Sequence, residues 1–171
     1  MTAQLRIRSV GIIAAVVLLD RLTKIWIQKS VTLMDVNPVI PGFFNIVHTE
    51  NPGAAFGFLS QSQGPWKSVL LMGVSAIVMS VILAMLWRPV KNGVAHSFLL
   101  HTGLALVFGG ALGNAWDRVV RGTVTDFLQF FIGSYEFPSF NVADSAITLG
   151  ATLLLLDLWK TRNHPAPQAT G

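Results

Sequence analysis

Four apolar blocks dominate this sequence, and each is long enough to cross a lipid bilayer. They lie at about Val10–Gln28, Trp66–Trp87, Val94–Gly113 and Val142–Trp159. A helix that crosses roughly 30 Å of hydrocarbon needs about 20 mostly apolar residues, and backbone groups cannot stay unpaired in lipid. The sequence therefore predicts an all-α integral membrane protein with four transmembrane helices, in one membrane-embedded domain at residues 1–163.

The content of charged residues agrees with this prediction. Only 12% of the 171 residues are charged, whereas a soluble domain carries about 25%. The basic residues lie at the ends of the apolar blocks, where they more readily set membrane orientation than bind nucleic acid. We therefore expect a membrane-lipid environment and no nucleic-acid partner.

The first block begins like a cleaved signal peptide, because Arg6 and Arg8 precede its apolar core. No small-residue cleavage site follows it, and Asp20, Arg21 and Lys24 come instead. We interpret the block as a retained helix.

Basic residues in the flanks predict that both termini are cytoplasmic. Six lie on one side of the predicted bundle, namely Arg6, Arg8, Arg88, Lys91, Lys160 and Arg162, and four lie on the other, namely Lys29, Lys67, Arg118 and Arg121. Because the basic turn at residues 88–91 is short, it weighs most in this comparison.

The same topology leaves two long extracytoplasmic segments, at about residues 29–65 and 114–141. They are rich in Gly, Pro, Asn and Phe, and Phe43–Val47 has the composition of a short strand. We expect a small β-like, amphipathic platform there. Residues 164–171 are Pro-rich and polar, which is typical of a disordered tail.

Asp126 and Asp144 are the candidate catalytic residues. Both fall at the predicted extracytoplasmic edge, each in apolar sequence, where ionisable groups are costly and usually functional. Two carboxylates within hydrogen-bonding reach share a proton, so that one can activate water while the other polarises a carbonyl. Such a pair hydrolyses peptides.

Structural roles remain open for both aspartates. Asn141 as the N-cap and Asp144 as the third helical residue match a capping box. Asp126 also fits a solvated carboxylate in a loop.

Three further positions are candidates at the same surface. Asn114 and Arg118 are separated by one helical turn and share a face, so that Arg118 could pair with Asp117, bind a headgroup or hold a substrate carbonyl. The loop that begins Asn51-Pro52-Gly53 is either a turn or a place where a substrate backbone approaches closely.

Asp20 and Lys24 in the first block have the spacing of an intrahelical ion pair. The glycines at Gly109–Gly113 allow close packing of helices in lipid.

Several chemistries are excluded by what the sequence lacks. It has no cysteine, its four histidines form no metal-binding pattern, and it has neither a phosphate loop nor a Gly-x-Ser-x-Gly elbow. We expect no metal and no cofactor.

Two other functions compete with the aspartyl pair. One is a serine-lysine peptidase that uses Lys24 with Ser139 or Ser145. The other is a small transporter or lipid-binding protein, for which spans broken by paired Gly/Pro interruptions are expected.

Five short motifs in this order resemble those of the lipoprotein signal peptidases, also called signal peptidase II, of bacterial plasma membranes. They are Asp20–Lys24, Asn51–Phe56, Gly109–Arg118, Val124–Phe127 and Phe140–Asp144. The resemblance implies an aspartic endopeptidase of the inner membrane, with its active site near the extracytoplasmic face. Its substrates would be diacylglyceryl-modified prolipoproteins, cut before the lipidated cysteine.

The resemblance also implies roles for particular residues. Asp126 and Asp144 would be the catalytic dyad, and Asp20 and Lys24 would support it. The groups that hold substrate backbone or the inhibitor globomycin would be Asn51, Asn114, Arg118 and Asn141, and we place Gly53 with them. We expect a monomer.

Overall fold

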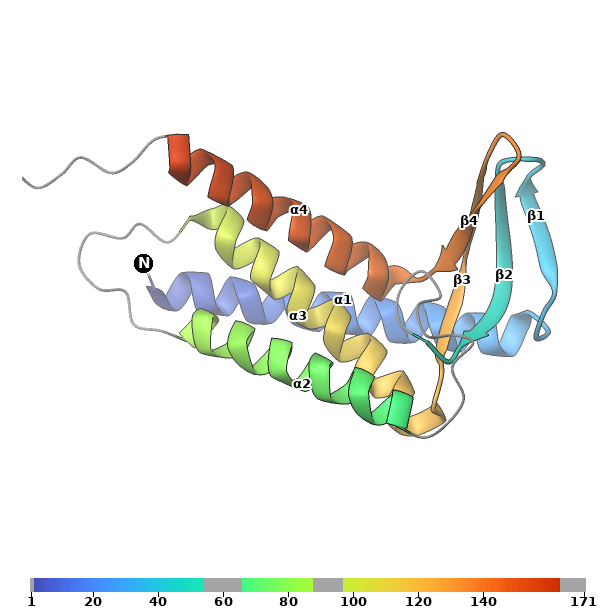
Figure 1. Cartoon of the computed structure of the whole chain (residues 1–171), viewed down its shortest axis with the longest axis horizontal. Coiled ribbons are helices and arrows are strands. Elements are labelled where there is room, and N and C mark those ends of the chain that lie inside the picture. The colour runs from blue at the N-terminus through green and yellow to red at the C-terminus, as the bar shows by residue number, and fades with distance from the viewer. Residues whose placement is uncertain (1, 54–65, 88–96, 164–171) are drawn as a thin grey trace, which may run out of the picture.

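Four long helices and a small sheet make up the protein. The computed structural model describes residues 2–53, 66–87 and 97–163. In chain order the elements are α1 (Thr2–Ser30), β1 (Val36–Ile40), β2 (Phe44–Asn51), α2 (Trp66–Trp87), α3 (Phe98–Arg121), β3 (Val124–Ile132), β4 (Tyr135–Phe140) and α4 (Val142–Asn163). The sheet stands at the end of the bundle where α1 and α3 end and where α2 and α4 begin (Figure 1).

Some predicted features lie outside the described residues. These are most of the loop that follows Gly53, the turn at residues 88–91, the start of the third apolar block at residues 94–96, and the tail at residues 164–171.

Within the described part of the chain, three helices are long and apolar enough to cross a membrane. They comprise Val69–Trp87, Phe98–Arg121 and Val142–Arg162. The first has a mean hydropathy of 2.7, and only 11% of it is buried inside the protein. In α1 the uncharged run is shorter, because it is bounded by Arg8 and Asp20.

Helix α3 packs against all three other helices. Its first turn is capped by Ser97, whose hydroxyl oxygen accepts from the Leu99 backbone N–H at 3.1 Å. It ends at Gly122, which adopts φ 80°, and the Gly122 N–H donates to the Arg118 carbonyl at 3.0 Å. The helix thus continues beyond the predicted end of its apolar block at Gly113, since a cap and not hydropathy sets where it stops.

Helices α3 and α4 cross at close range through small residues, as the sequence predicts. A Cβ atom on Gly110 would lie 2.4 Å from the Ala143 carbonyl oxygen. A Cβ atom on Gly150 would lie 2.7 Å from the Gly103 carbonyl oxygen. Close packing of backbones is how helices associate where no hydrophobic effect drives them together.

The sheet is antiparallel, with strand order β1-β2-β3-β4. The strand expected at Phe43–Val47 is present as β2, which continues to Asn51. Residues 124–140 form β3 and β4, in the segment where a β-like platform was expected, although the sequence analysis did not predict these two strands individually. The rings of Phe44 and Phe130 stack across β2 and β3 with centroids 4.7 Å apart.

The sheet is joined to the bundle by a small core. Ile27 and Val31 at the end of α1 pack with Phe127 of β3, and all three are buried. This contact fixes the start of β3 against the helices, and therefore the depth at which Asp126 lies.

Candidate active site

Asp126 and Asp144 come from different elements and meet at one cavity. Asp126 lies on β3 and Asp144 in the first turn of α4. Both line a cavity of about 490 Å³ between β4 and the start of α4. Its other walls are largely apolar and include Phe137, Phe140 and Ile147.

Asn141 connects the two carboxylates. Its side-chain amide donates to Asp126 Oδ1 at 2.7 Å, and its backbone N–H donates to Asp144 Oδ2 at 3.2 Å. Its side-chain oxygen accepts from the Asp144 backbone N–H at 2.9 Å. The predicted capping box is thus confirmed. Because Asn141 is fully buried, both aspartates are oriented by one residue that solvent cannot displace.

Two more asparagines complete the hydrogen bonds of the carboxylates. Asn51 on β2 donates to Asp126 Oδ2 at 3.0 Å, and Asn114 on α3 donates to Asp144 Oδ1 at 2.8 Å. Each of the four carboxylate oxygens therefore accepts at least one hydrogen bond, which fixes both side chains.

The surroundings of Asp126 favour its protonated form. Burial raises its pKa, and the nearby charge of Asp144 raises it further, to about 7. Hydrogen bonds from Asn51 and Asn141 and the charge of Lys24 oppose this shift in pKa. At neutral pH, therefore, the Asp126 carboxyl holds a proton in a large share of the molecules, and the pair has the asymmetry of an acid–base couple.

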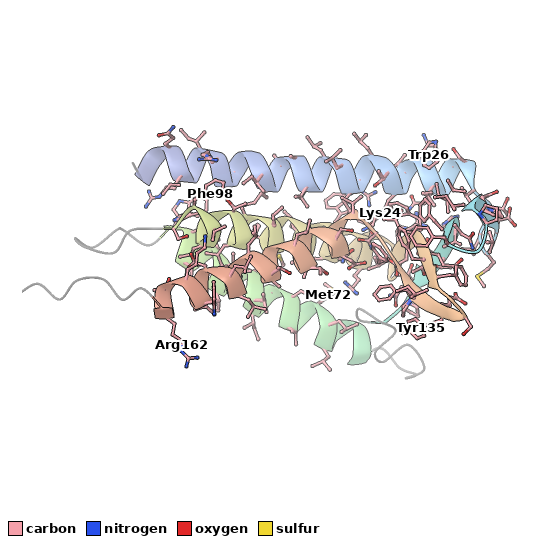
Figure 2. All side chains as sticks on the ribbon, turned by 90° about the horizontal axis from the view of Figure 1, so that it is seen from above. Lys24, Trp26, Met72, Phe98, Tyr135 and Arg162 are labelled. Atoms are coloured by element: carbon pink, nitrogen blue, oxygen red, sulfur yellow. The ribbon has the colours of Figure 1, made fainter. Side chains whose placement is uncertain are left out.

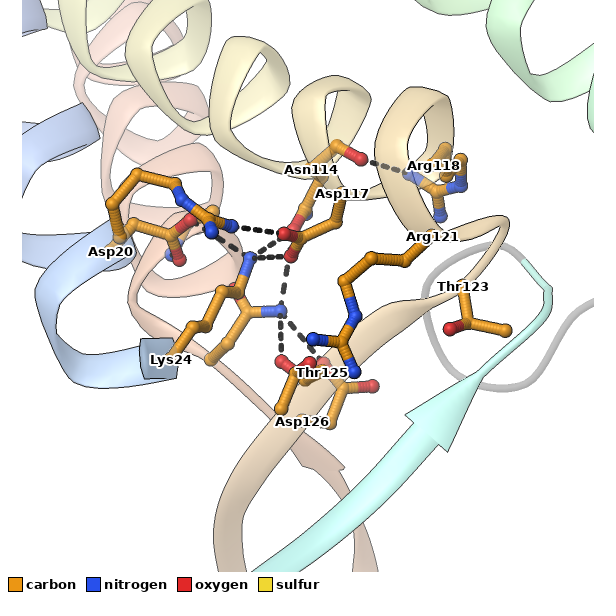
Figure 3. Close-up of polar contacts among 12 residues, drawn as sticks. Asp20, Lys24, Asn114, Asp117, Arg118, Arg121, Thr123, Thr125 and Asp126 are labelled. Atoms are coloured by element: carbon orange, nitrogen blue, oxygen red, sulfur yellow. Dashed lines mark hydrogen bonds and ion pairs between the residues drawn. The ribbon is translucent and has the colours of Figure 1, made fainter. Parts of the chain in front are cut away.

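A buried ionic network lies behind Asp144. Lys24 is fully buried, and its ammonium binds Asp20 at 2.8 Å, Asp117 at 2.8 Å and the Asn114 side-chain oxygen at 3.0 Å (Figure 3). The predicted pairing of Asp20 with Lys24 is thus present. Figure 2 shows Lys24 between α1 and the other helices, whereas Trp26 on the same helix is exposed.

This network holds the groups that bind Asp144. Lys24 fixes the Asn114 amide with its oxygen toward the ammonium, so that its N–H group faces Asp144. Asp20 Oδ1 accepts from the Ala143 backbone N–H at 3.1 Å, which anchors the first turn of α4.

Arg118 faces the loop that follows β2. Its guanidinium donates to the Gly53 carbonyl at 2.8 Å, and the Gly53 N–H donates to the Asn51 side-chain oxygen at 2.8 Å. Arg118 also interacts electrostatically with Asp144 and Asp126. All the positioning residues that the sequence predicts are therefore brought to one end of the bundle.

Asp117 and Arg21 are parts of the site that sequence reasoning missed. Asp117 binds Arg21 and Lys24, and not the neighbouring Arg118 that the spacing allowed. The contact between Arg21 and Asp117 joins residues 96 positions apart, so no local pattern could have indicated it.

The geometry does not support a serine-lysine pair. The Ser139 hydroxyl lies 2.9 Å from that of Thr49, and the Ser145 hydroxyl donates to the Asn141 carbonyl at 3.0 Å. Of the described residues, neither serine is hydrogen-bonded to Lys24, whose partners are two aspartates and an asparagine. Within the described part of the chain, no group of three or more His, Asp or Glu side chains is arranged to hold a metal ion.

Apolar helices around a buried, proton-binding carboxylate pair define a membrane enzyme, and solved structures agree. Two structures described as bacterial membrane enzymes superpose on this chain. The first has a TM-score of 0.81 and 31% identity, covering 96% of this chain and 94% of the other. The second has a TM-score of 0.75 and 34% identity, covering 90% and 93%.

Sequence comparisons specify the family. A family model described as signal peptidase (SPase) II matches residues 12–160. The lipoprotein signal peptidase of Solibacter usitatus is 43% identical over 95% of this chain and 96% of its own length. The lipoprotein signal peptidase of Maridesulfovibrio salexigens is 42% identical over 89% of this chain and 96% of its own length. That of Yersinia pseudotuberculosis is 38% identical over 88% of this chain and 86% of its own length. The chain belongs to the signal peptidase II family and is a peptidase.

Proposed function

We propose that this protein is an aspartic endopeptidase that removes signal peptides from diacylglyceryl-modified prolipoproteins. The observation that carries the proposal is that Asn141 donates hydrogen bonds to both Asp126 and Asp144 at one cavity. The raised pKa of Asp126 supports it. The relatives named lipoprotein signal peptidases support the class of substrate. The cleaved bond is the one before the lipidated cysteine.

The reaction needs one ionised and one protonated carboxyl. Asp144 lies at the N-terminus of α4, where the helix dipole favours a negative charge, so we assign it as the base. It removes a proton from water, which attacks the scissile carbonyl, while Asp126 donates its proton to the carbonyl oxygen. The tetrahedral intermediate then collapses, and the amine leaves with a proton returned by the pair.

The remaining residues position the substrate and the dyad. Arg118, whose guanidinium reaches the Gly53 carbonyl, is suited to hold a peptide carbonyl in the same region. Asn51, Asn114 and Asn141 hold the carboxylates, and we propose that substrate backbone binds in the same region. The same groups form the proposed site for globomycin.

Asp20 and Lys24 support the dyad from behind, through Ala143 and Asn114.

We further propose that all four helices cross the bacterial inner membrane, with both termini in the cytoplasm. Helix α1 carries charges within its length, but Asp20 and Lys24 are fully buried among the other helices and pair with each other. The sheet and the dyad then lie at the extracytoplasmic face, where a lipidated cysteine at the end of a signal helix would be found. Every residue of the proposed site comes from one chain, so we expect a monomer to be active.

Cleavage of a diacylglyceryl-modified prolipoprotein tests the dyad. Asp126→Asn and Asp144→Asn should each lose at least about a hundredfold in kcat, because each removes an acid–base group. Ser139→Ala and Ser145→Ala are the controls and should retain turnover. Near-normal turnover by either asparagine variant refutes the proposal. Loss of turnover confined to a serine variant would instead support a serine-lysine peptidase.

The assignment of the base has a separate test. A neutron structure of the free enzyme should show the shared proton on Asp126. A proton residing on Asp144 would reverse the two roles.

A further inference from the structure

Glu50 lies beside the proposed dyad, on the opposite face of the sheet. It pairs with Thr125 across β2 and β3, and the adjacent pair is Thr49 with Asp126. Because neighbouring residues of a strand point to opposite faces, Glu50 and Thr125 share the face that Asp126 does not use. Neither the motifs nor the proposed mechanism assigns Glu50 a role.

The Glu50 carboxylate gathers donors from two elements. Its Oε1 accepts from the Arg121 guanidinium at 3.0 Å and from the Thr125 hydroxyl at 3.0 Å, and its Oε2 accepts from the Thr123 hydroxyl. Arg121 is in the last turn of α3, and the two threonines flank Val124 at the start of β3. We call these four residues the Glu50 clamp.

Glu50 is ionised in this arrangement. Burial would raise its pKa, but hydrogen bonds from Thr123 and Thr125 and the charge of Arg121 lower the pKa below its ordinary value. His48 Nε2 lies 3.4 Å away on the same strand. The Thr125 hydroxyl accepts from Gln28 of α1 at 2.7 Å and so gives its own hydrogen to Glu50. A single charge therefore joins β2, β3 and the end of α3, and reaches α1 through Thr125.

Two residues of the Glu50 clamp are sequence neighbours of the donor and the acceptor of one hydrogen bond at the proposed dyad. Asn51 follows Glu50 directly, and Asp126 follows Thr125. The Asn51 amide donates to Asp126 Oδ2 at 3.0 Å, and this geometry requires that β2 and β3 stay in register at their last pairs. The pairing is irregular between Ile46 and Thr49, and beyond that irregularity the Glu50 clamp adds side-chain contacts that favour this register.

We propose that Glu50 is a positioning residue that, through the clamp, holds the Asn51 amide against Asp126. This inference rests on the proposed function only for its effect on catalysis. Its geometric content, the coupling of Glu50 to Asp126, can be measured without turnover.

Titration of Asp126 tests the coupling directly. The protonated carboxyl of Asp126 can be followed by infrared spectroscopy and identified by the loss of its band in Asp126→Asn. The hydrogen bond from Asn51 lowers the pKa of Asp126, so Glu50→Ala, which frees Asn51, should shift this titration to higher pH. The other charged groups that act on Asp126 are Lys24 on α1, Arg118 on α3 and Asp144 on α4, and the substitution leaves them in place.

A matched control separates this effect from a general change in the sheet. Glu136 is an exposed carboxylate on β4 that accepts a hydrogen bond from Gln129 at 2.6 Å. Glu136→Gln should leave the Asp126 titration unchanged. Thr123→Val removes one donor of the Glu50 clamp but keeps the ion pair, and should give a smaller shift in the same direction as Glu50→Ala.

The kinetic readout is a fall in kcat with little change in KM. A hydrogen bond to a charged group is worth enough to predict a loss of about tenfold in kcat for Glu50→Ala. Glu50→Gln keeps one acceptor oxygen and should recover part of that loss. The basic limb of the kcat profile should move to higher pH together with the infrared titration.

The outcomes are distinguishable. An Asp126 titration that is unchanged in Glu50→Ala, or in Thr123→Val should Glu50→Ala not fold, overturns the inference whatever the dyad variants do. A shifted titration together with active Asp126→Asn protein leaves the positioning role of Glu50 intact and refutes only the proposed mechanism.

Discussion

At the scale of single residues, burial of the Asp126 carboxyl lowers the stability of the fold. Asp126 is 2% exposed and lies near a second carboxylate. Removing such a group from water disfavours its charged form, and the raised pKa measures that penalty. The same penalty supplies the proton that the proposed mechanism needs. The proposed function and the stability of the fold are therefore in opposition at Asp126.

Replacement of Asp126 by asparagine should reveal this opposition as a pH dependence of stability. The pKa of Asp126 rises from 3.8 to about 7 on folding, so between these values the unfolded chain loses the proton that the folded protein keeps. The contribution of Asp126 to the unfolding free energy should therefore decrease as pH rises from about 4 to 7 in the native protein. Asp126→Asn should lack this decrease, which amounts to a few kcal/mol at most.

Thermal unfolding in detergent across this pH range is the measurement. Glu136→Gln is the control, because Glu136 is exposed, and should retain the native slope. A native slope that persists in Asp126→Asn would assign the pH dependence to another group.

At the scale of elements, the crossing of α3 and α4 decides whether Asp144 reaches its partners. Asn114 on α3 and Asp144 on α4 are hydrogen-bonded at 2.8 Å, one helical turn from the point where Gly110 meets Ala143. The helices can approach this closely only because Gly110 lacks a side chain. The glycine thus positions Asp144 of the proposed dyad, while no chemical role is proposed for the glycine itself.

Gly110→Ala should therefore impair both stability and activity. Its Cβ would lie 2.4 Å from the backbone oxygen of Ala143, so the helices must separate, at a cost of about 1–3 kcal/mol. Gly73→Ala in α2 is the matched control, because a Cβ there meets nothing within 4 Å. It should be neutral or slightly stabilising, since alanine favours a helix more than glycine does. Unfolding in detergent and turnover of each variant would check the pair, and equal effects would contradict the packing argument.

At the scale of the whole molecule, the proposed topology sends the sheet and the dyad to the extracytoplasmic face. All four helices end or begin at the sheet (Figure 1), so the orientation of any one helix fixes that of the others. Apolar side chains exposed at the sheet, such as Met34, Ile132 and Tyr135, would then lie near the outer lipid headgroups.

Single cysteines can report this orientation, because the chain has none of its own. Ser134 lies in the turn between β3 and β4, and Thr161 lies in the last turn of α4. In intact spheroplasts a membrane-impermeant maleimide should label Ser134→Cys and should label Thr161→Cys only after lysis. The reverse pattern would place the dyad on the cytoplasmic side.

The sequence by itself determined the parts of this protein that depend on local chemistry. Long apolar runs form helices in any apolar environment, and residues four apart share a face, so the helices, the Asp20–Lys24 pair and the Asn141–Asp144 capping box were all predictable. The position of Asp126 and Asp144 at the predicted membrane edge indicated a carboxylate pair, and the five motifs added the family.

Only the tertiary structure decided which distant residues meet. The binding of Arg21 to Asp117, the hold of Lys24 on Asn114 and the Glu50 clamp each join elements that are far apart in sequence. The bounds of strand β3 were not predicted, because β3 pairs with the distant strand β2, for example at Val124 and Asn51. Strand β4 pairs only with β3, so its place in the sheet depends on that of β3. Contacts of this kind depend on how helices and strands pack, and no local pattern encodes them.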